Sequence, residues 1–310
     1  MNKPIEVLVA GRLNVDYLCV IERYPEEDTK IRIIKRISDI GGQGGNTSCC
    51  IKRLGGSLKF ISRIGNDDEG RFCIELLNKS GIDTSSIRLV KGGHTTVSFV
   101  FISRLSGKRT LMYESEALPD LRLDRMMRSS ISRAGVLLLD PSVTHLATEL
   151  KAIKDRPPIV YDCERWREGI YDMMDLADYF VPSSLFLKDE KMGFKTSDPI
   201  EGIKTLARKV SNRLIMTDGR NGAYFIENGN IFNIRPPRVE IIDTTGAGDN
   251  FHGALALALS RNFSLKDSVK LAIAVATLSC RGYGGRAAVP EWNEAMDISK
   301  NLKAVRVCDA

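Results

Sequence analysis

The sequence predicts an α/β fold, in which a doubly wound, mostly parallel sheet carries helices on both faces and a small second β-sheet lies beside it. Short apolar strands alternate with longer helical segments along most of the chain, which is the pattern of strand–helix–strand units. The first strand, residues 5–11, is a nearly continuous apolar run, as expected for a strand buried on both faces. Two pairs of strands with alternating polar and apolar residues fall outside this rhythm and predict the second sheet.

The remaining elements of the main sheet follow in order from apolar runs and from cap and turn residues. The expected strands are residues 58–64, 135–139, 159–161, 179–181 and 213–216, the hairpin 223–226 with 231–234, and a strand end at 239–242. The expected helices are residues 47–54, 67–80, 142–154, 199–211, 248–259, 265–281 and 291–304. Three helices are therefore expected to close the chain.

The second sheet is expected to contain residues 17–21 paired with 31–37, and 95–103 paired with 109–113. Four such strands act either as a lid over an active site or as a dimer surface. Residues 1–310 then form a single domain, with the lid inserted from approximately 15–40 and 94–115.

The composition narrows the class of protein. A net charge of +6 over 310 residues, with no block of Lys or Arg, does not favour nucleic-acid binding, and it suits an anionic substrate such as a nucleotide. Seven cysteines without zinc-ligand spacing indicate reduced thiols in a cytoplasmic protein. No signal peptide is expected, and the longest apolar run, residues 254–259, is too short to cross a membrane.

Residues 243–249, which read Asp-Thr-Thr-Gly-Ala-Gly-Asp, are the strongest functional signal. Small residues between a strand and a buried helix let the backbone turn sharply, so the N–H groups of Gly246, Ala247 and Gly248 are expected to form an anion site. Asp249 beside that site is the expected general base, which takes a proton from a hydroxyl during phosphoryl transfer. The alternative is an ordinary strand–turn–helix in which the Asp is an N-cap.

Two polar residues follow the first strand. Asn14 and Asp16 alternate with apolar neighbours and therefore point to one face. Because ligands bind beyond the carboxyl ends of parallel strands, both side chains are placed to contact sugar hydroxyls. The alternative is a pair of Asx turns.

The glycine-rich loop, residues 41–46, precedes a helix at once and is expected to bind a ligand through Gly42, Gln43 and Asn46. Asn46 either reaches the ligand or caps the helix, and the alternative for the whole loop is a flexible linker. A second glycine-rich loop, residues 281–286, contains two arginines that either pair with phosphate oxygens or are solvated.

Other candidates lie at strand ends. Asp140, Asp162 and Thr217 each fall just past an expected strand, where such sheets hold their chemistry. Each is alternatively a plain helix cap.

This arrangement resembles the ribokinase (PfkB-type) family of carbohydrate kinases over essentially the whole chain. The family's two signatures are a Gly-Gly-rich loop ending in Asn, here residues 41–46, and a highly specific Asp-Thr-x-Gly-Ala-Gly-Asp string, here residues 243–249. Residues 246–257, 284–290 and 24–30 look closest to the ketohexokinase- and sulfofructose-kinase-like branch. The resemblance implies a doubly wound fold with a β-sheet lid.

The resemblance also implies a role for each residue that matches a family motif. Asp249 matches the catalytic base, and Gly246, Ala247 and Gly248 match the anion hole. The substrate contacts match Asn14, Asp16, Gly42 and Asn46, with Asp140 where the family often has a Glu near the substrate and metal, and the nucleotide loop matches Thr217, Gly219 and Gly222.

The chain departs from the family at its N-x-x-E motif, which assists magnesium and phosphate. Residues 182–186 read Pro-Ser-Ser-Leu-Phe there, so Mg²⁺ is expected to rely on ordered water or on other acids, the candidates being Asp140, Asp162, Glu164 and Asp243. The family also has a potassium site, which would lie beside Asp243 and Thr245, but Ala288 weakens the match.

The resemblance implies transfer of the γ-phosphoryl group of ATP to a hydroxymethyl group of a monosaccharide or close derivative, by a homodimer joined through the lid. Lys30 and Arg109, on lid segments, either contact the substrate or belong to a solvated face. One alternative is a nucleoside kinase, with a base pocket lined by Tyr17, Phe99, Phe101 and Tyr113. Another is a catalytically silent sugar- or nucleotide-binding regulator, because the N-x-x-E motif is missing.

Overall fold

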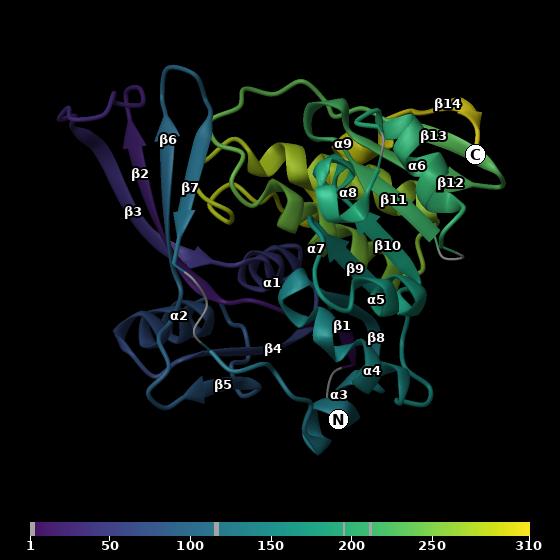
Figure 1. Ribbon diagram of the computed structural model, residues 1–310, viewed down its shortest axis with the longest axis horizontal. Coiled ribbons are helices and arrows are strands. Elements are labelled where there is room, and N and C mark those ends of the chain that lie inside the picture. Colours follow the sequence, from purple (N-terminus) through teal and green to yellow (C-terminus); the bar gives the residue numbers. More distant parts are fainter. Residues whose placement is uncertain (1–3, 115–117, 195, 211–212) are drawn as a thin grey trace.

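The computed structural model describes residues 4–114, 118–194, 196–210 and 213–310. A large sheet with helices on both sides makes up most of the molecule, and a smaller sheet stands beside it (Figure 1). The predicted α/β fold with a second, small β-sheet is therefore confirmed. Position 115 of the predicted lid and position 211 of a predicted helix lie outside the described residues.

The larger sheet contains ten strands among the described residues. In spatial order they are β5 (Ile87–Val90), β4 (Leu58–Gly65), β1 (Ile5–Ala10), β8 (Ala134–Leu139), β9 (Ile159–Cys163), β10 (Tyr179–Pro182), β11 (Arg213–Thr217), β12 (Ala223–Glu227), β13 (Asn230–Ile234) and β14 (Ala304–Asp309). Neighbours from β5 to β11 pair in parallel, and those from β11 to β14 pair antiparallel. The parallel strands therefore end at one edge, where such sheets bind ligands.

Two predictions near the C-terminus were wrong. Residues 239–242 form no strand, and Ile241 and Ile242 are exposed. The last helix does not close the chain, because β14 follows it and pairs with β13. This strand lies at the edge of the sheet, and its valines, Val305 and Val307, are exposed and separated by Arg306, so the strand gives little apolar signal.

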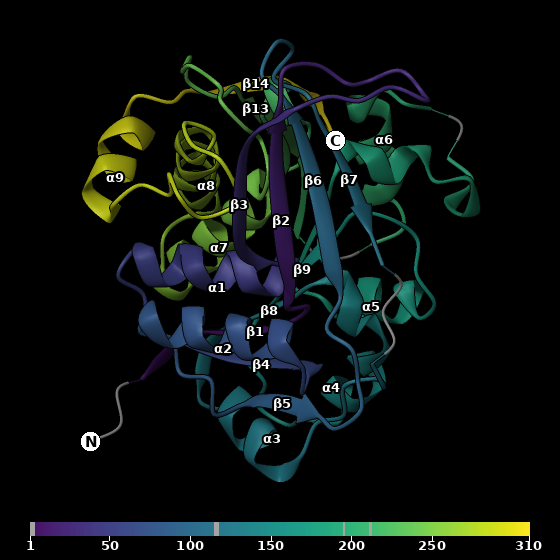
Figure 2. The same ribbon diagram turned by 90° about the vertical axis from the view of Figure 1, so that its left-hand side faces the viewer.

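Strand β1 shows why both faces of the sheet are covered. Val7 and Val9 belong to one apolar cluster, and Leu8 and Ala10 belong to another on the opposite face. The first cluster includes residues of α1 (Gln43–Arg53), α2 (Asp68–Lys79), α7 (Ala247–Ser260), α8 (Leu265–Ser279) and α9 (Trp292–Lys300). The second includes residues of α3 (Arg125–Ile131), α4 (Ala147–Lys151), α5 (Ile170–Leu176) and α6 (Pro199–Ala207). Figure 2 shows α8 and α9 on one side of the strands and α5 and α6 on the other.

The sequence did not predict α3, α5 or strand β5. Two of the predicted helices also differ in their start or their continuity. Helix α1 begins at Gln43, not at position 47, so part of the glycine-rich stretch forms its first turn. The expected helix 142–154 is interrupted, because Val143 has non-helical angles inside the short 3₁₀ segment η1 (Pro141–Leu146) that precedes α4. None of the described helices has the length and apolar composition needed to cross a bilayer.

The smaller sheet confirms both predicted strand pairs and their association. Its spatial order is β3 (Ile33–Gly41), β2 (Asn14–Ile21), β6 (Val97–Ser103) and β7 (Arg109–Tyr113). Residues directly opposite each other share a face, so Asp16, Ser98 and Tyr113 lie on the same side. We call this side the inner face, because Leu18 on it packs with Tyr283 from the main body of the molecule. The opposite side is the outer face.

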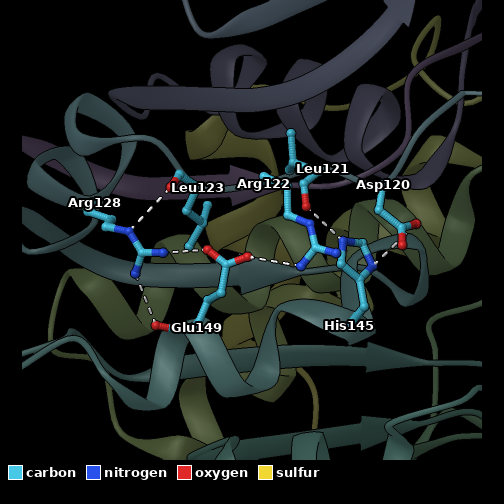
Figure 3. A network of polar contacts seen from close by, with 7 residues as sticks. All are labelled: Asp120, Leu121, Arg122, Leu123, Arg128, His145 and Glu149. Atoms are coloured by element: carbon cyan, nitrogen blue, oxygen red, sulfur yellow. Dashed lines mark hydrogen bonds and ion pairs between the residues drawn. The ribbon is translucent and has the colours of Figure 1, made fainter.

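The chain returns from the smaller sheet to the larger one through a segment fixed by polar contacts (Figure 3). Glu149 of α4 forms ion pairs with Arg128 and, at 3.6 Å, with Arg122. His145 lies 2.9 Å from the carbonyl oxygen of Leu121. These contacts hold the returning segment against η1 and α4.

A similar anchor joins α2 to the approach of β6. Asp67 accepts hydrogen bonds from the N–H of Gly70 (2.9 Å) as the N-cap, and from the N–H (2.6 Å) and hydroxyl (2.5 Å) of Thr95. Although partial burial raises the pKa of Asp67, the hydrogen bonds from Thr95 and Gly70 outweigh it and hold the pKa below its usual value. The stabilisation is therefore present at neutral pH and lost as the pH falls through the lowered pKa.

Asp67→Ala is expected to lower the free energy of unfolding by about 1–3 kcal/mol, because it removes the cap and both bonds to Thr95. Urea denaturation at pH 7 measures this loss. Asp68→Ala is the matched control, since the adjacent Asp68 is exposed and, in the described part of the chain, pairs only with exposed Arg71. It should cost under about 0.5 kcal/mol. Equal losses in the two variants would contradict the role of Asp67.

Candidate active site

Asp249 lies in the first turn of α7, and Gly246, not the Asp, is the N-cap residue. The φ angle of Gly246 is 71°, in the left-handed region, and a Cβ there would lie 2.5 Å from the Cα of Gly285. Among the described residues, no side chain caps this helix, and the N–H of Ala247 is engaged only by the Thr244 carbonyl oxygen at 3.3 Å. The space around Gly248 is open. A helix start of this kind suits an anion.

Asp249 is half-buried, and its carboxylate accepts a hydrogen bond from Asn46 Nδ2 at 2.7 Å. Burial raises the pKa of Asp249 to about 6, while the bond from Asn46 lowers it and the charge of Asp140 raises it. A carboxyl group with this pKa is mostly ionised at neutral pH and is basic enough to accept a proton.

Asn14 and Asp16 are both buried and form one polar cluster on the inner face of the smaller sheet. Asn14 Nδ2 donates to Asp16 Oδ1 (2.8 Å) and to Ser98 Oγ (3.1 Å). Burial raises the pKa of Asp16 to about 7; the bond from Asn14 lowers it, and the nearby charge of Asp249 raises it further. The predicted substrate contacts and the predicted base therefore lie close enough to interact.

The start of α1 brings the glycine-rich residues to the same place. Gly42, the N-cap, has φ 81°, and a Cβ there would lie 2.6 Å from the Arg12 carbonyl oxygen and 2.7 Å from Asn14 Oδ1. Gln43 Nε2 donates to Asp162 Oδ2 at 3.3 Å. Asn46 lies inside the helix and does not cap it, and its buried Oδ1 has no hydrogen-bond partner among the described residues.

Asp140 connects three segments at the end of β8. Its Oδ2 accepts from the N–H groups of Arg12 (2.6 Å) and Gly44 (3.1 Å), and its Oδ1 accepts from the N–H (2.8 Å) and hydroxyl (2.6 Å) of Ser142. Through these bonds Asp140 holds the three segments together, which is a structural role. A contact with substrate or metal stays a prediction.

Asp162 and His252 form a buried polar pair beneath Asp249. His252 Nδ1 lies 2.7 Å from the Gly248 carbonyl oxygen, which only accepts, so the proton is assigned to Nδ1. Nε2 then faces Asp162 Oδ1 at 3.5 Å. Burial lowers the pKa of His252 to about 4, and burial followed by the charge of Asp249 raises the pKa of Asp162 well above its usual range. Both groups are thus held neutral.

Asp243 fixes the loop that precedes α7 to the loop 281–286. Its carboxylate accepts from the N–H (3.0 Å) and hydroxyl (2.8 Å) of Thr245 and from the N–H of Gly284 (2.8 Å). The glycines of the second loop therefore do approach the candidate phosphate site.

The arginines of that loop are engaged elsewhere. Arg281 pairs with Glu294 at 2.6 Å, and Arg286 pairs with buried Asp39 of β3. Arg281 is exposed and fits the solvated alternative, whereas Arg286 is bound to a buried carboxylate and fits neither the phosphate pairing nor the solvated loop.

The candidate nucleotide loop follows β11, which ends at Thr217. The N–H of Asp218 donates to the Gly222 carbonyl oxygen at 2.8 Å, closing a tight turn around the 3₁₀ segment η4 (Gly219–Asn221). Open space surrounds Gly219, so a ligand has access to its backbone.

The departure from the N-x-x-E motif has a structural explanation. Pro182 ends β10, and Phe186 in the 3₁₀ segment η2 (Ser184–Lys188) is fully buried. Its ring packs edge-on against Phe180 at 5.8 Å. The segment thus contributes apolar core at this place.

Three remaining candidates are exposed. Arg109 of β7 donates to the hydroxyl of Thr244 and is close enough to lower the pKa of Asp249, whereas Lys30 lies in the connection between β2 and β3. Glu164 follows β9 and raises the pKa of Asp249.

Among the described residues, no three His, Cys, Asp or Glu side chains form a group that could hold a metal.

Sequence reasoning missed Ser98 and His252. Ser98 is a polar residue between apolar neighbours on β6, and its alternation with Val97 and Phe99 is the signal that places it on the inner face. His252 lies three residues after Asp249 and therefore on the same side of α7. Asp39 and Arg286, which are 247 residues apart, gave no signal for their pairing.

The fold and the site define a phosphotransferase with an alcohol group as acceptor. Residues 5–292 match the family model described as pfkB family carbohydrate kinase. The chain belongs to this family of kinases.

Relatives with known names match this chain over most of their length, and a solved structure shares its fold. A ribokinase of Lactococcus lactis is 24% identical over 304 residues, covering 96% of this chain and 98% of the relative. A probable fructokinase-5 of Arabidopsis thaliana is 28% identical over 293 residues, covering 85% and 88%. The crystal structure of a putative ribokinase from Agrobacterium tumefaciens has a TM-score of 0.86 and 23% identity, and the match covers 96% of this chain and 98% of that one.

Proposed function

We propose that this protein transfers the γ-phosphoryl group of ATP to a hydroxymethyl group of a monosaccharide or close derivative. One observation carries the proposal: half-buried Asp249 lies at a helix start that none of the described side chains caps, beside Asn46 and the Asn14–Asp16 pair. The helix start suits the phosphates, the polar pair suits the sugar, and the carboxylate lies between them.

In the proposed reaction, Asn14 and Asp16 hold the sugar so that one hydroxyl faces Asp249. A bond forms between that oxygen and the γ-phosphorus, and the bond from the γ-phosphorus to the bridging oxygen of ADP breaks. The hydroxyl proton passes to Asp249 and ADP leaves with the bridging oxygen. The N–H groups of residues 246–248 stabilise the charge on the phosphoryl oxygens.

Mg²⁺ in kinases is bound by one or two carboxylates, phosphate oxygens and water, so it needs no cluster of three acids. We propose Glu164 as its carboxylate, because Glu164 directly follows β9 and is exposed near Asp249. Asp162 fits less well, because it is buried and both of its oxygens face protein groups. When bound, the ion neutralises phosphate charge. Asp140 and Asp243 fit less well, because protein donors occupy both oxygens of each, which also weakens the expected potassium site.

The arrangement of aromatic residues favours a sugar over a nucleoside. Tyr17 and Phe99 stack at 5.7 Å on the outer face, and Phe101 shares that face by its position on β6. Of the four aromatic side chains that could have lined a base pocket, only Tyr113 lies on the inner face with Asp16.

A substrate screen tests the proposal. Formation of ADP from Mg-ATP is measured with ketoses, aldoses, sugar acids and nucleosides, alongside ATP binding by calorimetry. Turnover of a monosaccharide is the expected result. Turnover of nucleosides alone would overturn the sugar assignment, and ATP binding without ADP formation across the panel would favour the silent regulator.

Asn46→Ala is expected to shift the acidic limb of kcat/KM upward by about one pH unit. The hydrogen bond from Asn46 stabilises the ionised form of Asp249, so its loss raises the pKa above about 6, and more of the base is protonated at a given pH. The pH dependence of kcat/KM for the best sugar measures this shift.

The double variant with Asp249→Asn separates this effect from a lost substrate contact. If Asn46 acts on the base, adding Asn46→Ala to Asp249→Asn should not shift the pH dependence of kcat/KM at acidic pH, because the base is already absent. If Asn46→Ala alone leaves the acidic limb of kcat/KM in place, Asn46 does not control the pKa of Asp249.

We also propose that the smaller sheet covers the acceptor as a lid, since Arg109 connects β7 to residue Thr244 of the catalytic string. The proposed homodimer through this sheet fits the exposed Phe99 and Met112 of its outer face. A cytoplasmic location fits the seven free cysteines, six of them buried.

A further inference from the structure

The inner face of β7 extends over the site. Arg109, Leu111 and Tyr113 alternate along this strand and lie opposite Ile102, Val100 and Ser98 of β6. Arg109 at the beginning of the strand donates to Thr244, so this end lies over the string that contains Asp249.

Tyr113, at the other end of β7, lies beside the Asn14–Asp16 pair. It is directly opposite Ser98, and such pairs have Cβ atoms about 5 Å apart. Ser98 Oγ in turn accepts from Asn14, which also donates to Asp16. Arg109 and Tyr113 are four residues apart, or about 13 Å. Strand β7 therefore extends from the string that contains Asp249 to the Asn14–Asp16 pair.

The Tyr113 side chain is available to a ligand. The residue is 63% exposed, as the other residues of β7 also are exposed, whereas Leu18 and Val100 on the same face of the neighbouring strands are buried. Among the described residues, its ring makes none of the aromatic or cation–π contacts that engage Tyr17 or Tyr283. An exposed aromatic ring beside a buried hydroxyl-binding pair is the composition of a small-molecule pocket.

We propose that Tyr113 forms the wall of the acceptor site that selects a ring-closed sugar over an open-chain polyol, an inference that rests on the proposed function. A sugar ring presents hydroxyls at its edge and C–H groups on its face. Asn14 and Asp16 bind the hydroxyls, and the Tyr113 ring covers the C–H face. An open-chain alditol keeps the hydroxyls of the sugar and gains one from the ring oxygen, but it has no ring face and therefore loses this contact.

The test compares the best monosaccharide from the screen with the alditol obtained by reducing it. KM and kcat for each are measured in the wild-type enzyme and in Tyr113→Ala, Tyr113→Phe and Met112→Ala. Met112 is the matched control, since it is the adjacent residue, is 57% exposed and lies on the outer face.

Tyr113→Ala is expected to raise KM for the sugar roughly 10- to 100-fold with a smaller change in kcat, and to bring the sugar-to-alditol ratio of kcat/KM close to one. Tyr113→Phe and Met112→Ala should keep the wild-type ratio. A Tyr113→Ala enzyme with the KM and ratio of Met112→Ala would overturn this inference alone. A wild-type enzyme that forms ADP with no monosaccharide would overturn the proposed function.

Discussion

Asp249→Asn is expected to lower kcat by a factor of about 10² to 10⁴ while nearly sparing ATP binding. The amide keeps the shape of the carboxylate and still accepts the bond from Asn46 Nδ2, so the geometry of the helix start is retained. Only the capacity to take a proton is lost. Coupled ADP detection with the best sugar measures kcat, and calorimetry measures ATP binding.

Asp172→Asn provides the control, because Asp172 is an exposed acid in the first turn of another helix, α5. It should leave kcat unchanged. Near-normal turnover by Asp249→Asn would refute the assignment of the base, and a loss of thermal stability that matches the loss of activity would assign the residue to structure instead.

Gly246→Ala is expected to have the second largest effect. The alanine Cβ would lie 2.5 Å from the Cα of Gly285, and φ 71° disfavours any side chain. Relieving this clash moves the start of α7 away from the loop 281–286 and misplaces the anion site. The free energy of unfolding should fall by about 1–3 kcal/mol, and kcat/KM for ATP should fall on the order of 10²-fold.

Gly229→Ala separates backbone strain from the clash. Gly229 has φ 73° in the hairpin between β12 and β13, with open space where a Cβ would be. It should show the strain in urea denaturation and leave kcat/KM for ATP intact. If both variants lose stability alike and keep kcat/KM, the close approach of Gly246 to Gly285 has no part in nucleotide binding.

Most of the fold could be predicted, because strands buried on both faces must be almost wholly apolar. Residues 5–11 and 135–139 have this character and became β1 and β8. Where burial is one-sided or absent, the apolar pattern does not predict strands correctly. It missed β14, which is an exposed edge strand, and it predicted a strand at residues 239–242, which are mostly apolar but pair with no strand.

The candidate site was predictable where a residue's place depends on the local chain. Asn14 and Asp16 share a face by simple alternation, and the expected α7 starts at Ala247 within one residue. The contacts of each side chain were not predictable, because they depend on distant partners. Asp140 binds the N–H groups of Arg12 and Gly44, and Arg286 pairs with Asp39 instead of a phosphate.

The hydrogen bond between Asn46 and Asp249 joins residues 203 positions apart. A ribosome must therefore synthesise most of the chain before the two halves of the reaction centre can meet. Under the proposed function, partially synthesised or proteolytically shortened products that lack α7 retain the proposed sugar contacts but have neither the proposed base nor the proposed phosphate site. We therefore expect such fragments to form no ADP. Recovery of phosphotransfer during refolding should coincide with the slowest global phase and not with early helix formation.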